Sequence, residues 1–103
     1  MNRFDDIRKW AEDRNLIHGS TPDKQFLKLT EELGEVAAGM ARGNMMAISD
    51  GIGDMVVVMT ILAMQLDVSI EACIEQAWDE IKDRKGRMVN GVFIKESENQ
   101  NGK

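Results

Sequence analysis

Apolar residues recur along most of the chain at intervals of three or four positions, which is the spacing of amphipathic helices. In the first such stretch Phe4 and Ile7 lie on one stripe. The second stretch has a common helix start, Thr21 followed by Pro22, and a common helix stop at Gly43. The pattern predicts an all-α subunit of four helices, over residues 2–16, 22–42, 47–65 and about 70–85.

The third of these stretches is apolar on nearly every side of the expected helix. A helix that is apolar all round is usually buried all round. Four helices of one short chain can hardly surround one of their own. The pattern therefore favours a homo-oligomer, an oligomeric helical bundle formed through this helix, with a tightly wrapped monomer as the alternative.

The pattern changes after Gly86, where residues 88–94 form a short run of β-forming residues around the turn signal Asn90-Gly91. This run predicts a short C-terminal hairpin or extended arm. We expect residues 1–95 to form one domain and the polar tail, 96–103, to be disordered.

The composition limits the kinds of partner and the cellular compartment that we expect for this protein. The net charge of −5 argues against a nucleic acid as the main partner. Neither a leader-like segment nor an uninterrupted apolar run long enough to span a bilayer is evident, so no membrane partner is expected. The single cysteine, Cys73, suits a reducing compartment, and we expect a cytoplasmic location.

Acidic residues gather on one side of the second predicted helix. Glu31, Glu32 and Glu35 are three and four residues apart, so their carboxylates lie within an arc of about 100°. Lys28 can pair with Glu31 or Glu32. Taken alone, these acids are equally compatible with a solvated acidic face.

Two further acids favour a metal site over a solvated acidic face. Asp50 and Asp54 lie four apart on the third predicted helix, and their direction continues through apolar residues. No Lys or Arg occurs between Asn44 and Asp67, so this helix cannot neutralise its own acids. Asp50 has a simpler alternative role as a partner of the helix dipole. Acids on two helices, without a His or Cys cluster, predict a site for Mg²⁺, with Mn²⁺ as a substitute.

The two acidic segments resemble those of the MazG-like nucleoside triphosphate pyrophosphohydrolases, an all-α family. The resemblance is carried by Glu31-Glu32-Leu33-Gly34-Glu35, by Gly53-Asp54 and by the stretch 81–93, and it covers about residues 23–96. It implies a homo-oligomer, a dimer or tetramer, that hydrolyses a (deoxy)nucleoside triphosphate between its α- and β-phosphates. The family usually has glutamate three residues before the aspartate, where this chain has Gly51.

The resemblance also implies roles for individual residues. Glu31 is the candidate catalytic base, although it can equally be a ligand. The candidate metal ligands are Glu32, Glu35, Asp54 and, in place of the usual glutamate, Asp50. Because aspartate is shorter, a catalytically weak nucleotide- or metal-binding regulatory module of the same fold is the alternative function.

Several side chains are candidates for holding the nucleotide. The candidate substrate-binding residues are Lys28, Lys82, Arg84, Lys85, Asn90 and Trp10. The three basic residues from 82 to 85 are also explained as a cluster at the C-terminal end of a helix dipole. Trp10 and Asn90 are also explained as packing residues.

Overall fold

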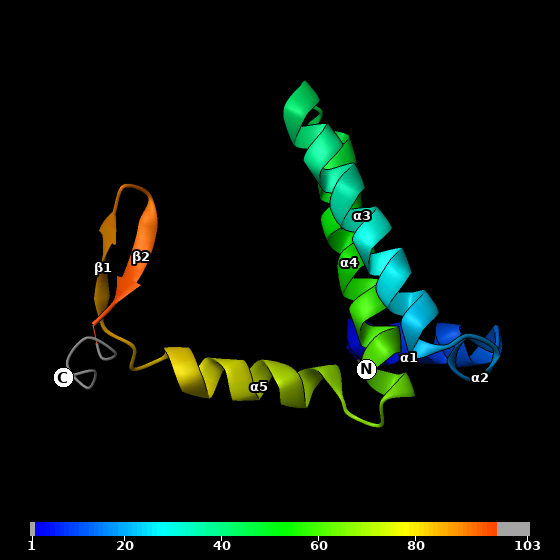
Figure 1. Cartoon of the computed structure of the whole chain (residues 1–103). Coiled ribbons are helices and arrows are strands. Elements are labelled where there is room, and N and C mark those ends of the chain that lie inside the picture. The colour runs from blue at the N-terminus through cyan, green and yellow to red at the C-terminus, as the bar shows by residue number, and fades with distance from the viewer. Residues whose placement is uncertain (1, 97–103) are drawn as a thin grey trace. The chain divides into compact units, whose positions relative to one another are not determined.

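The computed structural model describes residues 2–96. The chain divides after Ile70 into two compact units, each described here by itself. The first unit contains helices α1 (Arg3–Asp13), α2 (Leu16–Gly19), α3 (Pro22–Arg42) and α4 (Met45–Gln65). Figure 1 shows α3 and α4 as two long helices that run side by side, with the short helices α1 and α2 at one end of the pair.

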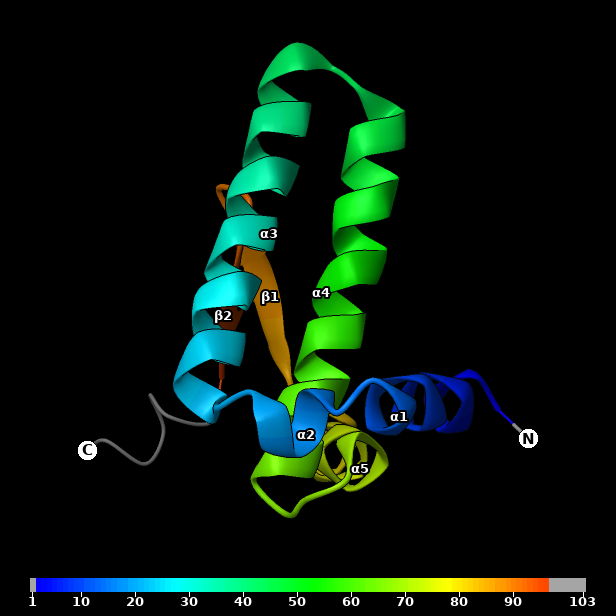
Figure 2. The ribbon, with the colours of Figure 1, turned by 90° about the vertical axis from the view of Figure 1, so that its right-hand side faces the viewer.

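Helices α3 and α4 form an antiparallel hairpin whose ends are fixed by local sequence (Figure 2). The Thr21 hydroxyl accepts a hydrogen bond from the backbone N–H of Lys24 at 3.2 Å, and Pro22 occupies the first turn of α3. Gly43 ends α3 in the left-handed conformation, with φ at 67°. The Asn44 side chain then caps α4 by accepting from the N–H of Ala47 at 3.2 Å. The predicted start and stop signals are thus confirmed.

Close contact between the two helices depends on two glycines. A Cβ atom at Gly39 would lie 3.1 Å from Ile48 Cγ1, and one at Gly51 would lie 2.5 Å from Val36 Cγ2. A Cβ atom added at the other two helical glycines of the pair, Gly34 and Gly53, would meet no atom within 4 Å. Only the first two are therefore required by the packing of α3 on α4.

The N-terminal segment differs from the prediction in one respect. The helix expected over 2–16 ends at Asp13, because Asn15 adopts a left-handed conformation (φ 58°) and starts the separate turn α2. The Gln65 amide at the end of α4 donates to the carbonyl oxygens of Leu16 and Ile17, at 3.3 and 3.4 Å. These bonds tie the α2 turn to α4.

The core of the first unit is built mainly by residues of α4. Its buried apolar side chains are Ala11, Val58, Ile61 and Ala63. Thr60 is also fully buried, and its hydroxyl donates to the Val56 carbonyl at 2.8 Å. Much of the remaining surface of α4 is exposed, including Ile52 and Leu66.

By length and composition alone, α4 could cross a membrane, a test that core helices of soluble proteins also pass. Only 22% of its most apolar window is buried within the chain. The expectation that one chain cannot cover this helix agrees with that exposure.

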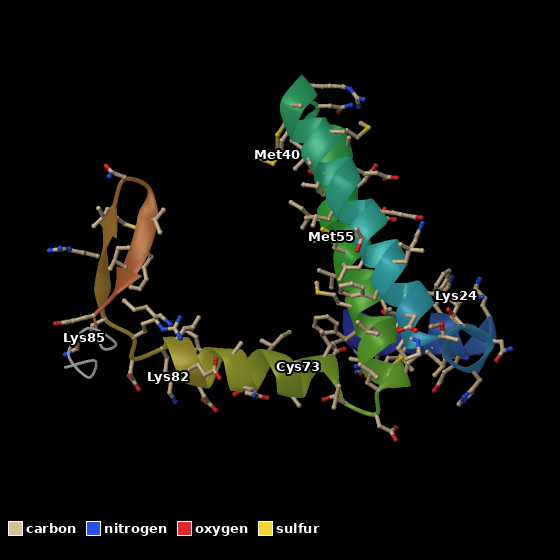
Figure 3. All side chains as sticks on the ribbon, viewed as in Figure 1. Lys24, Met40, Met55, Cys73, Lys82 and Lys85 are labelled. Carbon is tan, nitrogen blue, oxygen red and sulfur yellow. The ribbon has the colours of Figure 1, made fainter. Side chains whose placement is uncertain are left out.

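The second unit contains helix α5 (Ile70–Ile81) and strands β1 (Gly86–Val89) and β2 (Val92–Lys95). The strands pair antiparallel with Val89 opposite Val92, and the connecting Asn90 and Gly91 both have positive φ, at 52° and 82°. Such a turn matches the right-handed twist of the strands, which explains the Asn-Gly signal. Figure 3 shows the exposed Cys73 on α5 and Lys82 just after that helix.

The predicted fold class is confirmed, since the described part of the chain is mainly helical and ends in a two-stranded hairpin. The tail predicted to be disordered lies, beyond Glu96, outside the described residues.

Candidate functional site

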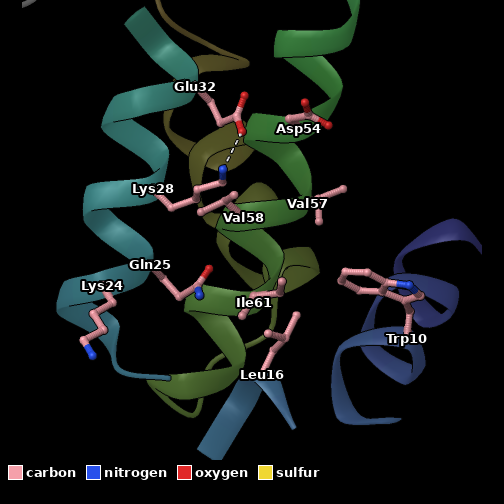
Figure 4. A pocket seen from close by; sticks show the side chains of 10 residues that line it. All are labelled: Trp10, Leu16, Lys24, Gln25, Lys28, Glu32, Asp54, Val57, Val58 and Ile61. Carbon is pink, nitrogen blue, oxygen red and sulfur yellow. Dashed lines mark ion pairs between the residues drawn. The ribbon is translucent and has the colours of Figure 1, made fainter. Parts of the chain in front are cut away.

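A pocket of about 450 Å³ opens between α3, α4 and the N-terminal segment (Figure 4). Apolar side chains from α4 form much of its lining, and charged side chains from α3 lie at its edge. It is lined by Trp10, Leu16, Lys24, Gln25, Lys28, Glu32, Asp54, Val57, Val58 and Ile61. Three residues predicted from sequence as ligands or substrate contacts on α3 and α4 thus meet at one place, together with Trp10 of α1.

Glu32 is the unusual member of this pocket. It is only 5% exposed, and one of its carboxylate oxygens, Oε2, lies 3.4 Å from the Lys28 ammonium. The other oxygen, Oε1, is buried and has no hydrogen-bond partner. A buried acceptor without a partner costs about 1–3 kcal/mol, and more when it is charged. The buried Glu32 carboxylate is therefore costly for the stability of the fold.

Asp54 brings a second carboxylate to the pocket from α4. Figure 4 shows it beside Glu32, extending on the side of Trp10. It also lines a second pocket, of about 440 Å³, together with Asp6, Ile7, Trp10 and Val57. Asp54 is itself exposed, so its carboxylate is open to solvent and to ligands.

The remaining predicted acids are more exposed. Glu31 Oε1 lies 3.9 Å from the Lys28 ammonium, and its side chain is more than half exposed. Glu35 and Asp50 are exposed and line neither pocket. Within residues 2–96, no three acidic, His or Cys side chains are close enough together to hold a metal ion. Roles for Glu31, Glu35 and Asp50 at the site stay predictions.

Position 51 has a packing role in this chain. Gly51 is buried, and its α-carbon faces the backbone and side chain of Val36 on α3. The Cβ atom of any larger residue at position 51 would lie 2.5 Å from Val36 Cγ2. A glutamate at the position that is usual in the resembling family therefore does not fit between these helices unless Val36 moves.

The other predicted substrate contacts divide between the two units. Trp10 lines both pockets and carries the Arg14 guanidinium 4.7 Å from its ring centroid. Lys82 pairs with Asp79 at 3.3 Å in the second unit. The remaining candidates of that unit are Arg84, Lys85 and Asn90, the last of them in the hairpin turn. Contacts of the second unit with substrate stay predictions.

Sequence reasoning missed Lys24 and Gln25 as pocket residues. Lys24, Lys28 and Glu32 are spaced four apart and therefore follow one stripe of α3, a signal present in the sequence. The Gln25 amide donates to the Ser20 hydroxyl at 3.1 Å, which orients it at the pocket wall. Leu16 was not identifiable, because its place depends on the extra turn α2.

The fold and the site define a helical protein in which carboxylates of two antiparallel helices face one pocket beside basic and aromatic side chains. Residues 20–89 match the family model of the MazG nucleotide pyrophosphohydrolase domain. The chain belongs to this family, which confirms the resemblance seen in the sequence.

A relative comes from Haemophilus phage HP1, an uncharacterized 18.2 kDa protein of the rep-hol intergenic region. It is 58% identical over 59 residues, which are 57% of this chain and 36% of the relative. The aligned part thus spans about a third of the phage protein. No solved structure matches the chain.

Members of the MazG family generally depend on a divalent metal ion. The residues of this pocket fit such an ion, since the donors are carboxylate oxygens and the buried Oε1 of Glu32 has no other partner. Mg²⁺ in particular is often held by only one or two carboxylates together with water and substrate phosphates. Glu32 and Asp54 would hold the ion.

Proposed function

We propose that this protein is a Mg²⁺-dependent nucleoside triphosphate pyrophosphohydrolase, which converts a (deoxy)nucleoside triphosphate and water into the monophosphate and pyrophosphate. Membership of the MazG family supports pyrophosphohydrolase activity in general. Control or cleansing of the nucleotide pool is the use that we propose for the reaction.

The observation that carries the proposal is the buried Glu32 carboxylate with one unpartnered oxygen. A protein with no use for a cation would gain stability by replacing such a group with an apolar side chain. Glu32 and Asp54 line the same pocket as Lys24 and Lys28, and this set of charges supports binding of a triphosphate together with a metal ion.

In the proposed reaction, charged residues bind the ion, the water and the phosphates, and apolar residues bind the rest of the nucleotide. Glu32 and Asp54 would hold the ion, which would supply charge neutralisation at the phosphates and lower the pKa of an attacking water. Glu31, exposed on the neighbouring stripe of α3, orients or deprotonates that water. Lys24 and Lys28 lie one turn apart at the pocket edge and hold phosphate oxygens. The apolar wall with Trp10 receives the remainder of the nucleotide.

A homo-oligomer is part of the proposal. Apolar side chains of α4 stay exposed in the single chain, among them Ile52 at 54% and Met46 at 76%. Exposed large apolar side chains on one helix support an interaction through that helix. We infer that copies of the chain pack through α4 as a dimer or tetramer, and that Glu35 and Asp50 complete the sites in the assembly.

The proposal is tested by product analysis with purified full-length protein. Canonical and modified (deoxy)nucleoside triphosphates are incubated with Mg²⁺ or Mn²⁺, and nucleotide products and pyrophosphate are separated by chromatography. The expected products are equal amounts of monophosphate and pyrophosphate. Release of orthophosphate and diphosphate would show cleavage at the other anhydride bond and refute the proposed reaction.

Matched variants assign the activity to the pocket. Glu32→Gln should lower kcat by about 100-fold or more, because ligation of the metal contributes several kcal/mol to the transition state. Glu12→Gln makes the same change on the exposed surface of α1 and should leave kcat unchanged. Equal activity of the two variants would place catalysis elsewhere.

One observation favours the alternative of a weak, regulatory module. The position of the usual family glutamate is filled by Gly51 packed on Val36, and the described part of a single chain brings no third acid to the pocket. Tight binding of a nucleotide with Mg²⁺ but no turnover across the whole panel of substrates would select this alternative.

A further inference from the structure

Lys28 lies on α3 between two other lining residues of the pocket, Glu32 and Lys24, each four positions away. Its ammonium lies 3.4 Å from the buried Glu32 carboxylate and 3.9 Å from the exposed Glu31 carboxylate. Toward the other end of the pocket, the next side chain on the same stripe of α3 is Lys24. Figure 4 shows the Lys28 side chain directed toward Glu32, with the ion pair drawn between them.

The burial of the two partners is unequal, and this inequality suggests a role. The Glu32 side chain is 7% exposed, whereas the Lys28 side chain is 53% exposed. Glu32 has no room to leave the pocket and needs a positive charge at all times, because an unpaired buried carboxylate is very costly. Lys28 has a flexible four-carbon stem in contact with solvent, so its ammonium is free to move.

A divalent cation and the Lys28 ammonium compete for the same carboxylate. With a cation of charge +2 on Glu32, the nearby Lys28 ammonium is repelled, and its attraction to the carboxylate is cancelled. A substrate whose phosphate chain lay beside Lys24 and Lys28 would offer that ammonium a new partner. The repulsion that displaces the Lys28 ammonium from Glu32 therefore leaves it available to bind a substrate phosphate.

We propose that Lys28 is a resident counter-cation, which neutralises Glu32 in the metal-free protein and transfers to a substrate phosphate when a divalent ion binds. This inference rests on the proposed function for its second half. It makes Lys28 a positioning residue for the metal and a binding residue for the phosphates. The exchange keeps the buried carboxylate neutralised in every state.

The test compares Lys28→Met with Lys9→Met. Lys9 pairs with Asp13 at 3.0 Å with the same four-residue spacing, but both side chains are more than half exposed. Lys9→Met therefore makes the same change in net charge and breaks the same kind of pair away from the pocket. Lys28→Arg keeps the positive charge and should bind metal like the wild type.

The first readout is the Kd for Mn²⁺ without nucleotide, measured by calorimetry. Lys28→Met should bind Mn²⁺ about tenfold more tightly than the wild type, because a competing like charge is gone. Lys9→Met should match the wild type. The second readout is the Kd for inorganic triphosphate in excess Mg²⁺, which Lys28→Met should weaken about tenfold by losing a charged phosphate contact. Both shifts are required, and the absence of either overturns the proposal.

A measurement on the wild type covers the case in which Lys28→Met does not fold. Titration with Mg²⁺, followed by NMR of the lysine ¹³Cε resonances, should shift the Lys28 signal while that of Lys9 stays in place. A Lys28 signal that does not respond to saturating Mg²⁺ overturns the exchange. The Mn²⁺ readout is independent of turnover, so tighter binding in Lys28→Met together with an inactive wild type refutes the proposed function and leaves the counter-cation role standing.

Discussion

The two glycines Gly51 and Gly53 lie on the same helix, α4, and their replacement by alanine should have opposite effects on stability. Both substitutions gain up to about 1 kcal/mol from helix propensity. A new methyl group at Gly53 meets no atom within 4 Å, so Gly53→Ala should stabilise the fold by about 0.5–1 kcal/mol. At Gly51 the methyl group would lie 2.5 Å from Val36 Cγ2.

Val36 cannot easily make room for that methyl group. A β-branched side chain in a helix has one strongly preferred rotamer, so relief requires α3 and α4 to separate. Overpacking of this kind costs about 1–3 kcal/mol. After a propensity gain of about 1 kcal/mol, Gly51→Ala should destabilise the fold by up to about 2 kcal/mol. The difference between the two alanine variants isolates the packing cost.

The assay is urea unfolding followed by circular dichroism at one fixed protein concentration, since association would otherwise shift the midpoint. A double-mutant cycle with Val36→Ala tests the assigned contact. Gly51→Ala should be much less harmful in the Val36→Ala background, with a coupling energy of about 0.5–3 kcal/mol. If Gly51→Ala proved as stabilising as Gly53→Ala, the close contact between α3 and α4 at this level would be wrong.

Three further predictions concern the pocket and the assembly. Glu32→Met should raise the melting temperature of the metal-free protein by about 4–8 °C for each kcal/mol of net gain. Removing the unpartnered acceptor gains about 1–3 kcal/mol, and loss of the half-exposed Lys28 pair costs at most about 1 kcal/mol. A lower melting temperature contradicts this. Asp54→Asn should reduce the thermal stabilisation by Mn²⁺ by several degrees, whereas Asp67→Asn, at the end of α4, should retain it. Dilution should lower the melting temperature and reduce the mass seen by light scattering if α4 joins copies of the chain, and a constant monomeric mass would refute that assembly.

Sequence alone was sufficient for the long elements. Helix α3 was predicted with its observed limits, because Thr21, Pro22 and Gly43 act locally on the backbone. The hairpin turn was predictable for the same reason, since Asn90 and Gly91 tolerate positive φ. The α2 turn was missed, because it is held by side-chain bonds from Gln65, which lies 48 and 49 residues away in the chain.

The candidate site was predictable as a set of residue types and less so as a geometry. Helical spacing placed Glu31, Glu32 and Glu35 on one side of α3, but that arc spans both the buried and the exposed edges of the helix. Only contact with α4 decides that Glu32 is buried while its neighbours are exposed. The spacing of Asp54 from Val57 and Ile61 did carry the information that it faces the pocket.

Position 51 links the packing of the fold to the chemistry of the site. Gly51 and Asp50 are adjacent, so their side-chain directions differ by about 100° around α4. The Gly51 position faces α3, and Asp50 is exposed. Asp50 lines neither pocket of the single chain, and its role as a replacement for the usual glutamate stays a prediction.

Glu32 and Asp54 are the two carboxylates at the pocket, and a Mg²⁺ ion held by them would keep coordination positions for water and phosphate oxygens. A site of this composition is completed by its substrate. The ion should therefore bind weakly alone and more tightly with a triphosphate, and by linkage the triphosphate should bind more tightly with the ion.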